Sequence, residues 1–187
     1  MSTPILRDFP DHLETERLLI RAPRAGDGAE NCAAVQESLA ELRPWMPWAM
    51  EPLTPESQEA VMRRAHIDFM ARTDLMLLLL LKGTNTMVGS SGLHRIDWRV
   101  PRFEIGYWLR TAYTGRGYMT EAVNAIAAFA FDTLEARRVE IRCDERNTRS
   151  AAVARRCGFA LEGVLRHSGR SHFDSELVNE MVFAQIR

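Results

Sequence analysis

The chain of 187 residues has the length of one domain, and a domain of this size buries about 70% of the surface that its unfolded chain exposes. Its 24 lysines and arginines balance its 25 aspartates and glutamates, so the net charge gives no reason to expect nucleic acid or an anionic membrane as a partner. We therefore expect a single domain over residues 1–187.

The first part of the chain predicts one strand and two helices. Leu18–Arg21 is a short apolar strand, and residues 28–42 form a plausible helix. Three prolines in residues 43–52 exclude a regular helix there. The segment Thr54-Pro55-Glu56-Ser57 is typical of a helix start, and the helix is expected to run to about Arg72.

The middle of the chain predicts three antiparallel strands. The apolar run 75–81 indicates a buried central strand and is too short to cross a bilayer. A turn at 82–86 joins it to a strand over 87–93, which makes a hairpin. A third strand is expected at about 102–109.

The last part of the chain predicts a mixed α/β order. Apolar residues recur at helical spacing after residue 118, on one face formed by Met119, Ala122, Val123, Ile126, Phe129, Ala130 and Leu134. Residues 138–143 alternate like a strand. A second helix is expected from Thr148 to Cys157, with Asn147 as its N-cap and Gly158 as its left-handed C-cap. Two strands, near 160–168 and 179–186, complete the chain.

The junction between the third strand and the following helix is the most informative segment. Gly115 and Gly117 are separated by one residue, which leaves several backbone N–H groups close together and unpaired. The helix start adds its own unpaired donors and the positive end of its dipole, and together these attract phosphate. A tight turn without a ligand is the alternative interpretation.

The three cysteines give information about the compartment. Cys32, Cys143 and Cys157 are odd in number and far apart, so they fit neither a disulfide framework nor a set of zinc ligands. We expect no metal site. No apolar signal-peptide segment follows Met1, and the expected location is the cytoplasm.

Several motifs, in this order and spacing, resemble the GNAT superfamily of acyl-CoA N-acyltransferases. The similarity is closest to the RimJ/RimL branch, the protein N-terminal acetyltransferases known for acting on ribosomal proteins. The motifs span nearly the whole chain and lie at residues 15–21, 104–109, 115–122, 147–150, 157–159 and 161–163.

The resemblance implies a mixed, mostly antiparallel sheet flanked by helices, with a splayed central strand pair that holds acetyl-CoA. The pyrophosphate is expected on the backbone of Thr114, Gly115, Arg116, Gly117, Tyr118, Met119 and Thr120. A bulge in the preceding strand is expected to let the pantetheine arm pair with Tyr107, Trp108 and Leu109. Asn147 is expected to contact that arm as well as cap its helix. Ala112 departs from the family, which often has Gln or Arg there.

The resemblance also implies a residue that assists the leaving thiolate. Many relatives use a tyrosine that corresponds to Ala154 here, so this acid is missing. Ser150 matches the serine assigned to this step in RimL-like enzymes. A glutamate assigned as the base in those enzymes corresponds to Gly169, which leaves both the base and the acceptor open.

The base must accept a proton from the acceptor amine. At pH 7 a free α-amine is deprotonated at a cost of roughly 1.4 kcal/mol, against nearly 5 kcal/mol for a lysine side chain. Glu104, on the central strand, is the first candidate, and His94 and His167 are alternatives. Glu121 most simply complements the helix dipole.

The sequence therefore predicts an acetyl-CoA-dependent N-acetyltransferase that acts on a protein N-terminus, with Trp45 and Trp48 as an apolar wall of the acceptor site or as core residues. A small amine or antibiotic as acceptor is one alternative, and a non-catalytic CoA-binding regulatory module is another. A dinucleotide-binding domain is disfavoured, because Thr120 stands where its third glycine or alanine belongs. The resemblance also suggests a homodimer.

Overall fold

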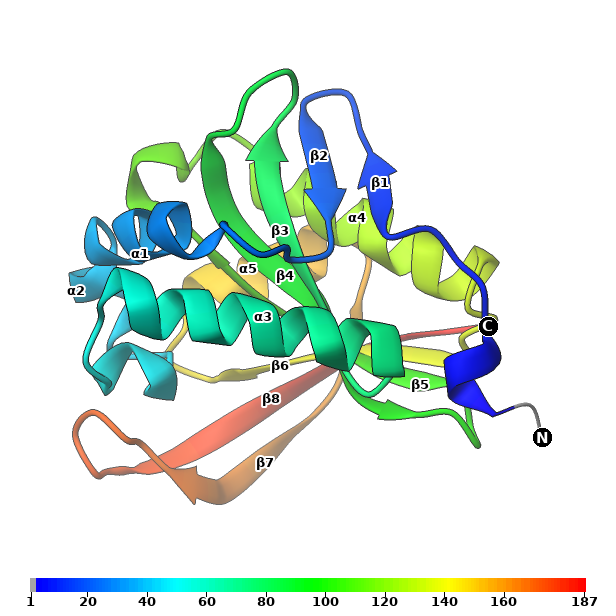
Figure 1. The fold of residues 1–187 in the computed structure, drawn as a ribbon. Helices are drawn as coiled ribbons and strands as arrows, with labels where there is room; N and C mark the ends of the chain where they lie inside the picture. The colour runs from blue at the N-terminus through cyan, green and yellow to red at the C-terminus, as the bar shows by residue number, and fades with distance from the viewer. Residues whose placement is uncertain (1–2) are drawn as a thin grey trace.

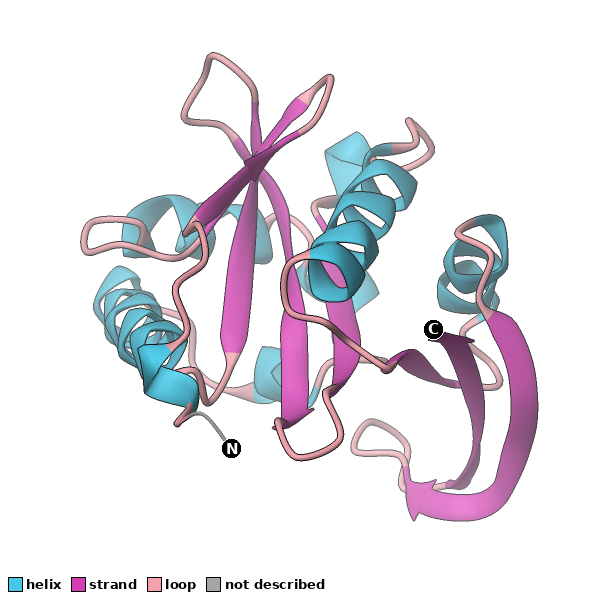
Figure 2. Ribbon diagram, turned by 90° about the vertical axis from the view of Figure 1, so that its right-hand side faces the viewer, coloured by secondary structure: helices cyan, strands magenta, loops and turns pink. Residues whose placement is uncertain are grey.

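The computed structural model describes residues 3–187 and contains one sheet of eight strands in the order β1-β2-β3-β4-β5-β6-β8-β7 (Figures 1 and 2). Only β5 and β6 run parallel, and the other neighbours are antiparallel. The strands are β1 His12–Glu14, β2 Leu18–Arg21, β3 Leu75–Leu81, β4 Met87–Asp97, β5 Arg102–Leu109, β6 Arg138–Asp144, β7 Ala160–Arg170 and β8 Leu177–Ile186.

Helices cover both faces of this sheet. The α-helices are α1 Gly28–Gln36, α2 Leu39–Leu42, α3 Pro55–Ala71, α4 Tyr118–Asp132 and α5 Thr148–Arg156, and the 3-10 turns are η1 Pro4–Leu6, η2 Pro47–Met50 and η3 Thr111–Tyr113. Helices α1 and α3 lie on one face and α4 on the other (Figure 1). This mixed, mostly antiparallel arrangement confirms the predicted fold and is not a doubly wound dinucleotide-binding sheet. None of the helices within residues 3–187 has the length and apolar content needed to cross a membrane.

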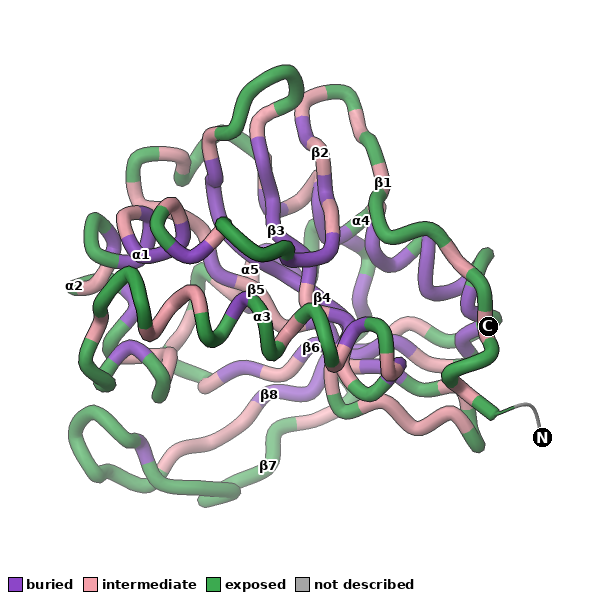
Figure 3. The backbone as a smooth tube through the Cα atoms, in the orientation of Figure 1, coloured by how far each residue is buried: buried purple, intermediate pink, exposed green. Residues whose placement is uncertain are grey.

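The core lies on the two faces of the central strands, which Figure 3 shows as the most buried part of the chain. Strand β3 sits between β2 and β4 and is largely buried, as its apolar run predicts. The predicted apolar face of α4, from Met119 to Leu134, is also buried in full. Because each fully buried aliphatic or aromatic side chain contributes roughly 1.5–3 kcal/mol, this layer accounts for much of the stability of the sheet.

The expected helix ends are confirmed. The Thr54 side chain accepts from the Ser57 N–H, and the Ser57 hydroxyl accepts from the Thr54 N–H. The Asn147 side chain caps α5 by accepting from the Ser150 N–H at 3.1 Å. Gly158, at φ 77°, ends α5 in a left-handed conformation that returns two N–H groups to the last helical carbonyls.

One predicted helix is wrong in its extent, and one strand was not predicted. The expected helix 28–42 is two helices, because the buried Ser38 between them donates its hydroxyl to the Ala34 carbonyl and accepts the Thr111 N–H. A local side-chain bond of this kind competes with helix continuation. Strand β1 was not predicted, because three mostly exposed residues are too few to show the alternation of apolar and polar side chains that marks a strand.

The parallel strands β5 and β6 separate soon after they meet. They pair only at Arg102↔Arg138, Phe103↔Val139 and Glu104↔Glu140. Beyond this point β5 continues beside β4 as far as Leu109, and β6 continues beside β8 as far as Asp144. The predicted splayed central pair is therefore present.

The bulge expected at Tyr107–Leu109 is not present in the pairing of β5 with β4. The register runs without a shift from Gly89↔Leu109 to His94↔Glu104, and the irregularity lies between His94 and Asp97. Arg95, at φ 48°, occupies that position. The divergence from β6, rather than a bulge against β4, opens the edge of β5.

The contact between α1 and α3 depends on a glycine. A Cβ added to Gly28 would lie 2.4 Å from the Glu59 backbone, and such a contact forces the helices apart. We predict that Gly28→Ala lowers the free energy of unfolding by roughly 1–3 kcal/mol, as overpacking does. Thermal melting measures this loss. Gly163→Ala is the control, because its Cβ would meet open space, and equal melting temperatures for the two variants would contradict the prediction.

Candidate active site

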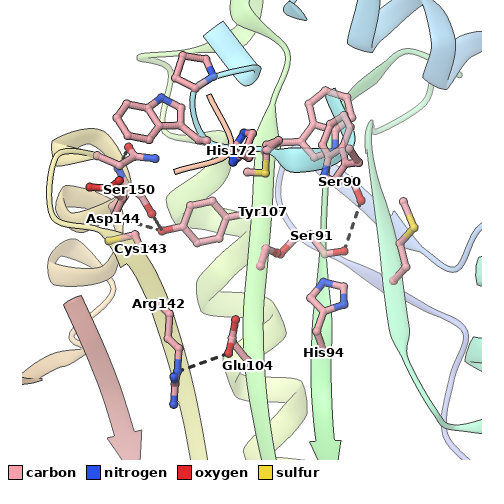
Figure 4. Close-up of a pocket in the computed structure, with 18 of the residues that line it drawn as sticks. Ser90, Ser91, His94, Glu104, Tyr107, Arg142, Cys143, Asp144, Ser150 and His172 are labelled. Atoms are coloured by element: carbon pink, nitrogen blue, oxygen red, sulfur yellow. Dashed lines mark hydrogen bonds and ion pairs between the residues drawn. The ribbon is translucent and has the colours of Figure 1, made fainter. Parts of the chain in front are cut away.

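A cavity of about 780 Å³ lies where β5 and β6 separate. The loop 43–52, helices α1 and α3, and the connection between β7 and β8 complete its walls. Figure 4 shows Tyr107, Ser91, His94 and Glu104 in the strands at its centre. The cavity has an aromatic end near the loop and a charged end near Glu104 and Arg142.

Seven of the fifteen predicted site residues line this cavity. They are Trp45, Trp48, Glu104, Tyr107, Trp108, Asn147 and Ser150. Trp48 lies over Trp108 with the ring centroids 5.9 Å apart. Leu109, the last residue of β5, and the turn 114–120 that follows it do not line the cavity. Most of the turn is exposed. The structure thus brings three parts of the predicted site together: strand β5, the loop 43–52, and the start of α5.

Tyr107 and Ser150 form a hydrogen-bonded pair in the cavity wall. The Tyr107 phenol donates to the Ser150 carbonyl oxygen at 3.1 Å. Its oxygen also lies 3.0 Å from the Ser150 hydroxyl, a contact in which either hydroxyl can donate (Figure 4). Burial raises the pKa of Tyr107, so the phenol is neutral at physiological pH. The sequence predicted only a backbone role for Tyr107, whereas its side chain fixes Ser150.

Cys143 lies beside this pair on β6. Its thiol interacts with the Ser150 hydroxyl, and burial raises the pKa of the thiol above its ordinary value. A thiol with a raised pKa is a poor nucleophile. Cys143 therefore forms part of the wall rather than an activated nucleophile. Ala154, where relatives carry a tyrosine, is fully buried in α5.

Glu104 occupies the charged end of the cavity. Its carboxylate lies 2.9 Å from Arg95 and 3.6 Å from Arg142. The pKa of Glu104 is raised, and burial is the largest cause. The positive charges of Arg95 and Arg142 lower this pKa, whereas the negative charges of Glu140 and Glu180 raise it further. A carboxylate with a raised pKa is a better proton acceptor at neutral pH than an ordinary glutamate.

His94 also lines the cavity, beside Glu104. Its Nδ1 lies 2.8 Å from the Asp74 carboxylate, which orients the ring. The ring packs on the β5 backbone, where a Cβ at Gly106 would approach it to 3.1 Å. The second candidate histidine, His167, is exposed on β7 away from the cavity, so the structure excludes it as a base in this cavity.

The position of the missing RimL-type glutamate is also resolved. Gly169 pairs with Val178 in the β7–β8 ladder and does not line the cavity. The residues that follow it, Arg170, Ser171 and His172, do line the cavity, and His172 Nε2 lies 2.8 Å from the Arg43 carbonyl.

The glycine turn has the geometry of an anion site. Gly115 and Gly117 have φ of 74° and 81°, the left-handed region that glycine adopts most readily. The backbone N–H groups from Gly115 to Thr120 find no acceptor among residues 3–187. They lie at the exposed start of α4, so the residues present fit a phosphate group.

Two residues of the turn that leads into β2, Thr15 and Arg17, hold this glycine turn in place. The Glu121 carboxylate accepts from the Thr15 hydroxyl at 2.6 Å, and from the Arg17 backbone and guanidinium. Arg17 also donates to the Arg116 carbonyl at 2.8 Å and covers the Tyr118 ring. Glu121 therefore does more than complement the helix dipole, because it ties the glycine turn to the sheet.

Sequence reasoning missed several residues of the cavity. Asn31, Arg142, Glu180 and His172 line it, and Asp74 supports His94. They come from five separate elements or loops, so no local pattern identifies them. Within residues 3–187 no group of three or more His, Cys, Asp or Glu side chains is arranged to hold a metal ion.

The chain is similar to named acetyltransferases. YdaF of Bacillus subtilis, whose name describes a ribosomal N-acetyltransferase, is 29% identical over 155 residues, which cover 81% of this chain and 82% of YdaF. The ribosomal-protein-serine acetyltransferase of Escherichia coli is 35% identical over 82 residues, which cover 44% of this chain and 46% of that protein.

Solved structures share the fold. The microcin C7 self-immunity acetyltransferase MccE, in complex with acetyl-CoA and AMP, has a TM-score of 0.88 at 22% identity and covers 96% of this chain and 98% of its own. RimL, the ribosomal L7/L12 α-N-protein acetyltransferase in complex with coenzyme A, has a TM-score of 0.85 at 23% identity, with 92% and 95% covered.

Residues 17–160 match the family model of the acetyltransferase (GNAT) domain, a span that includes the glycine turn, the splayed strands and Ser150. The chain belongs to the GNAT acetyltransferases, enzymes that use acetyl-CoA as their acetyl donor.

Proposed function

We propose that the protein transfers the acetyl group of acetyl-CoA to the N-terminal α-amine of a protein. The observation that carries this proposal is the Tyr107–Ser150 pair in a cavity at the splay of β5 and β6, which the half-buried Glu104 carboxylate also lines. The names of the relatives, which describe ribosomal N-acetyltransferases and a ribosomal-protein-serine acetyltransferase, support this acceptor class.

The turn and the open edge of β5 would hold the donor. The unpaired N–H groups of residues 115–120 suit the pyrophosphate, with Thr114 beside them, and Tyr107, Trp108 and Leu109 offer the pantetheine arm a strand edge that β6 has left. Asn147, at the start of α5 on the opposite side of the splay, would contact the same arm. Backbone N–H groups on that edge would also polarise the thioester carbonyl.

Transfer needs one bond made and one broken. The amine nitrogen attacks the thioester carbon, the carbon–sulfur bond breaks, and one proton passes overall from the amine to the sulfur. Ser150 would donate a hydrogen bond to the leaving thiolate, with Tyr107 holding its hydroxyl in position. Glu104 would accept the amine proton, and its raised pKa suits that role.

An α-amine is the acceptor that this machinery suits best. Its deprotonation at pH 7 costs roughly 1.4 kcal/mol, whereas that of a lysine side chain costs nearly 5 kcal/mol, so the single half-buried carboxylate of Glu104 suffices. Trp45 and Trp48 would form the wall against the acceptor. A small amine remains the alternative acceptor, because the cavity has room for one and Gly169 replaces the RimL-type glutamate.

Three further expectations belong to the same proposal. We take residues 1–187 as one N-acetyltransferase domain, since one sheet runs through them. A cytoplasmic location fits Cys32, Cys143 and Cys157, which form no disulfide. A homodimer follows from the branch resemblance, and the exposed edge strand β7 is a suitable surface for it.

Release of CoA thiol across a panel of acceptors tests the function. We expect turnover with peptides that carry a free α-amine, at least tenfold above N-acetylated peptides with an internal lysine, because the α-amine is far easier to deprotonate. If only small amines react, the proposal that the acceptor is a protein N-terminus is contradicted. Acetyl-CoA binding without turnover of any amine would contradict the proposed function as a whole.

Ser150→Ala should lower kcat by roughly 10–100-fold while the Kd for acetyl-CoA stays within about twofold, since a bond to the leaving thiolate forms mainly in the transition state. Stopped-flow turnover and calorimetry give the two values. Ser168→Ala, on the exposed strand β7, is the matched control. If affinity falls while bound complex turns over normally, Ser150 binds the cofactor instead.

Glu104→Gln tests the raised pKa of this half-buried carboxylate through stability. The folded-state pKa of Glu104 is raised, so the folded protein holds this proton more tightly than the unfolded chain. Stability from Glu104 is present below its unfolded pKa and is lost as the pH rises through the folded pKa. We predict that the unfolding free energy of the wild type, relative to the variant, falls as the pH rises above the unfolded pKa of about 4. Denaturant titrations that give a constant or rising difference would contradict the raised pKa.

A further inference from the structure

A histidine in the cavity wall is held by an aspartate behind it. His94 Nδ1, on β4, lies 2.8 Å from a carboxylate oxygen of Asp74, in the turn before β3. A carboxylate oxygen accepts a hydrogen bond, so Nδ1 carries a proton and the neutral ring keeps a lone pair on Nε2. Among residues 3–187 Nε2 has no hydrogen-bond partner, and it is open to solvent in a side chain that is 31% exposed. This nitrogen can therefore accept a proton from a bound molecule.

Two glycines bring this nitrogen toward Tyr107. Gly92 and Gly106 pair across β4 and β5, and an added Cβ would lie 3.0 Å from Nε2 at Gly92 and 3.4 Å from it at Gly106. Because neither residue has a Cβ, the imidazole can lie over this pair. Gly106 directly precedes Tyr107, whereas Glu104 lies one ladder pair further away, opposite His94. Along β5, Nε2 is therefore placed between Glu104 and the tyrosine whose phenol contacts the serine of α5.

The other charged groups at this end of the cavity pair with one another. Arg95 follows His94 on β4 and lies 2.9 Å from Glu104 of β5. Arg142 of β6 lies 3.6 Å from Glu104 and 3.3 Å from Glu180 of β8. Helix α3 lines the cavity with uncharged side chains, namely Ser57, Gln58, Val61 and Met62. The aspartate behind the ring is therefore the charged group that engages the imidazole, while two arginines engage Glu104.

An α-ammonium gives up two protons when it becomes an amide. An α-amine has a pKa of about 7.7–8.0, so most of the acceptor is ammonium at pH 7. The first proton must leave before the nitrogen can attack. The second leaves as the carbon–nitrogen bond forms, and this is the proton assigned to Glu104. One carboxylate holds one proton at a time, so the first proton needs another acceptor.

We infer that His94 Nε2 accepts the first proton, from the α-ammonium of the acceptor, and passes it to water, while Glu104 accepts the second. The inference rests on the proposed function, because it assigns one step of that transfer. In this step an N–H bond of the ammonium breaks, its electron pair stays on the amine nitrogen, and an N–H bond forms at Nε2. His94 is then a catalytic residue, and Asp74, which acts through the ring, is a positioning residue.

The pH dependence of kcat/KM separates this step from a structural role. The wild type and His94→Gln are compared with a free α-amine peptide and saturating acetyl-CoA. At pH 7 the variant relies on the roughly one-tenth of the peptide that is already neutral, so its kcat/KM should be about tenfold lower. At about pH 9 most of the peptide is neutral, and the variant should come within about twofold of the wild type. His12→Gln is the matched control, because His12 contacts Asp11 at 2.9 Å outside the cavity, and it should equal the wild type at both pH values.

Asp74→Asn tests the same step without changing the histidine. An amide can donate to Nδ1, which moves the ring proton to Nε2 and removes the lone pair. This variant should therefore also lose kcat/KM at pH 7 and approach the wild type at about pH 9. Glu104→Gln should be slow at both pH values, because its proton leaves as the new bond forms.

A loss in His94→Gln that is equal at both pH values overturns the inference, and so does an unchanged kcat/KM at pH 7. Either result leaves the proposed function standing, because the wild type still acetylates the peptide. If thermal melting shows that His94→Gln does not fold, the same comparison with Asp74→Asn decides. A wild type that acetylates no α-amine peptide refutes the proposed function, and this step with it.

Discussion

The site depends on where β5 and β6 stop pairing. Their parallel register ends at Glu104↔Glu140, which places two carboxylates opposite each other, and such like charges repel. Arg142 lies between them, 3.6 Å from Glu104 and 3.0 Å from Glu140. This guanidinium holds the strands together at their last shared pair. Beyond it they diverge, and every other feature of the cavity occupies the space that the divergence creates.

Side-chain contacts hold each side of the opening, and the Tyr107–Ser150 hydrogen bond joins β5 to α5 across it. On the β6 side, Ser150 is placed by the N-terminal cap of α5 and by the Tyr107 phenol. On the β5 side, the chain continues into the glycine turn, which Glu121 and Arg17 tie back to the sheet. Preorganised donors of this kind stabilise developing charge without reorganisation at the moment of reaction. The acceptor end is different, since loop 43–52 and helices α1 and α3 form it.

Local signals in the sequence predicted most of the fold, because each element carries its own periodicity and caps. The apolar face of α4, the Asn147 cap and the left-handed Gly158 are examples. Prediction failed where a tertiary contact overrides the local preference for a helix. Ser38 is an example, because its hydroxyl accepts a hydrogen bond from the Thr111 N–H and the helix is interrupted there. The site was predicted through motifs, whereas Asn31 and the Asp74–His94 contact have no local signature, because the residues they join are far apart in the chain.

Amide hydrogen exchange with and without acetyl-CoA tests most directly that the donor occupies the opening between β5 and β6. We predict slower exchange in the complex at Tyr107–Leu109 and at Gly115–Thr120, with a smaller effect at the start of α5. The edge of β5 that β6 has left and the N–H groups of the glycine turn are unpaired, and the start of α5 borders the same opening. Unchanged exchange in both segments, with protection confined to another part of the chain such as the β7–β8 hairpin, would contradict the account.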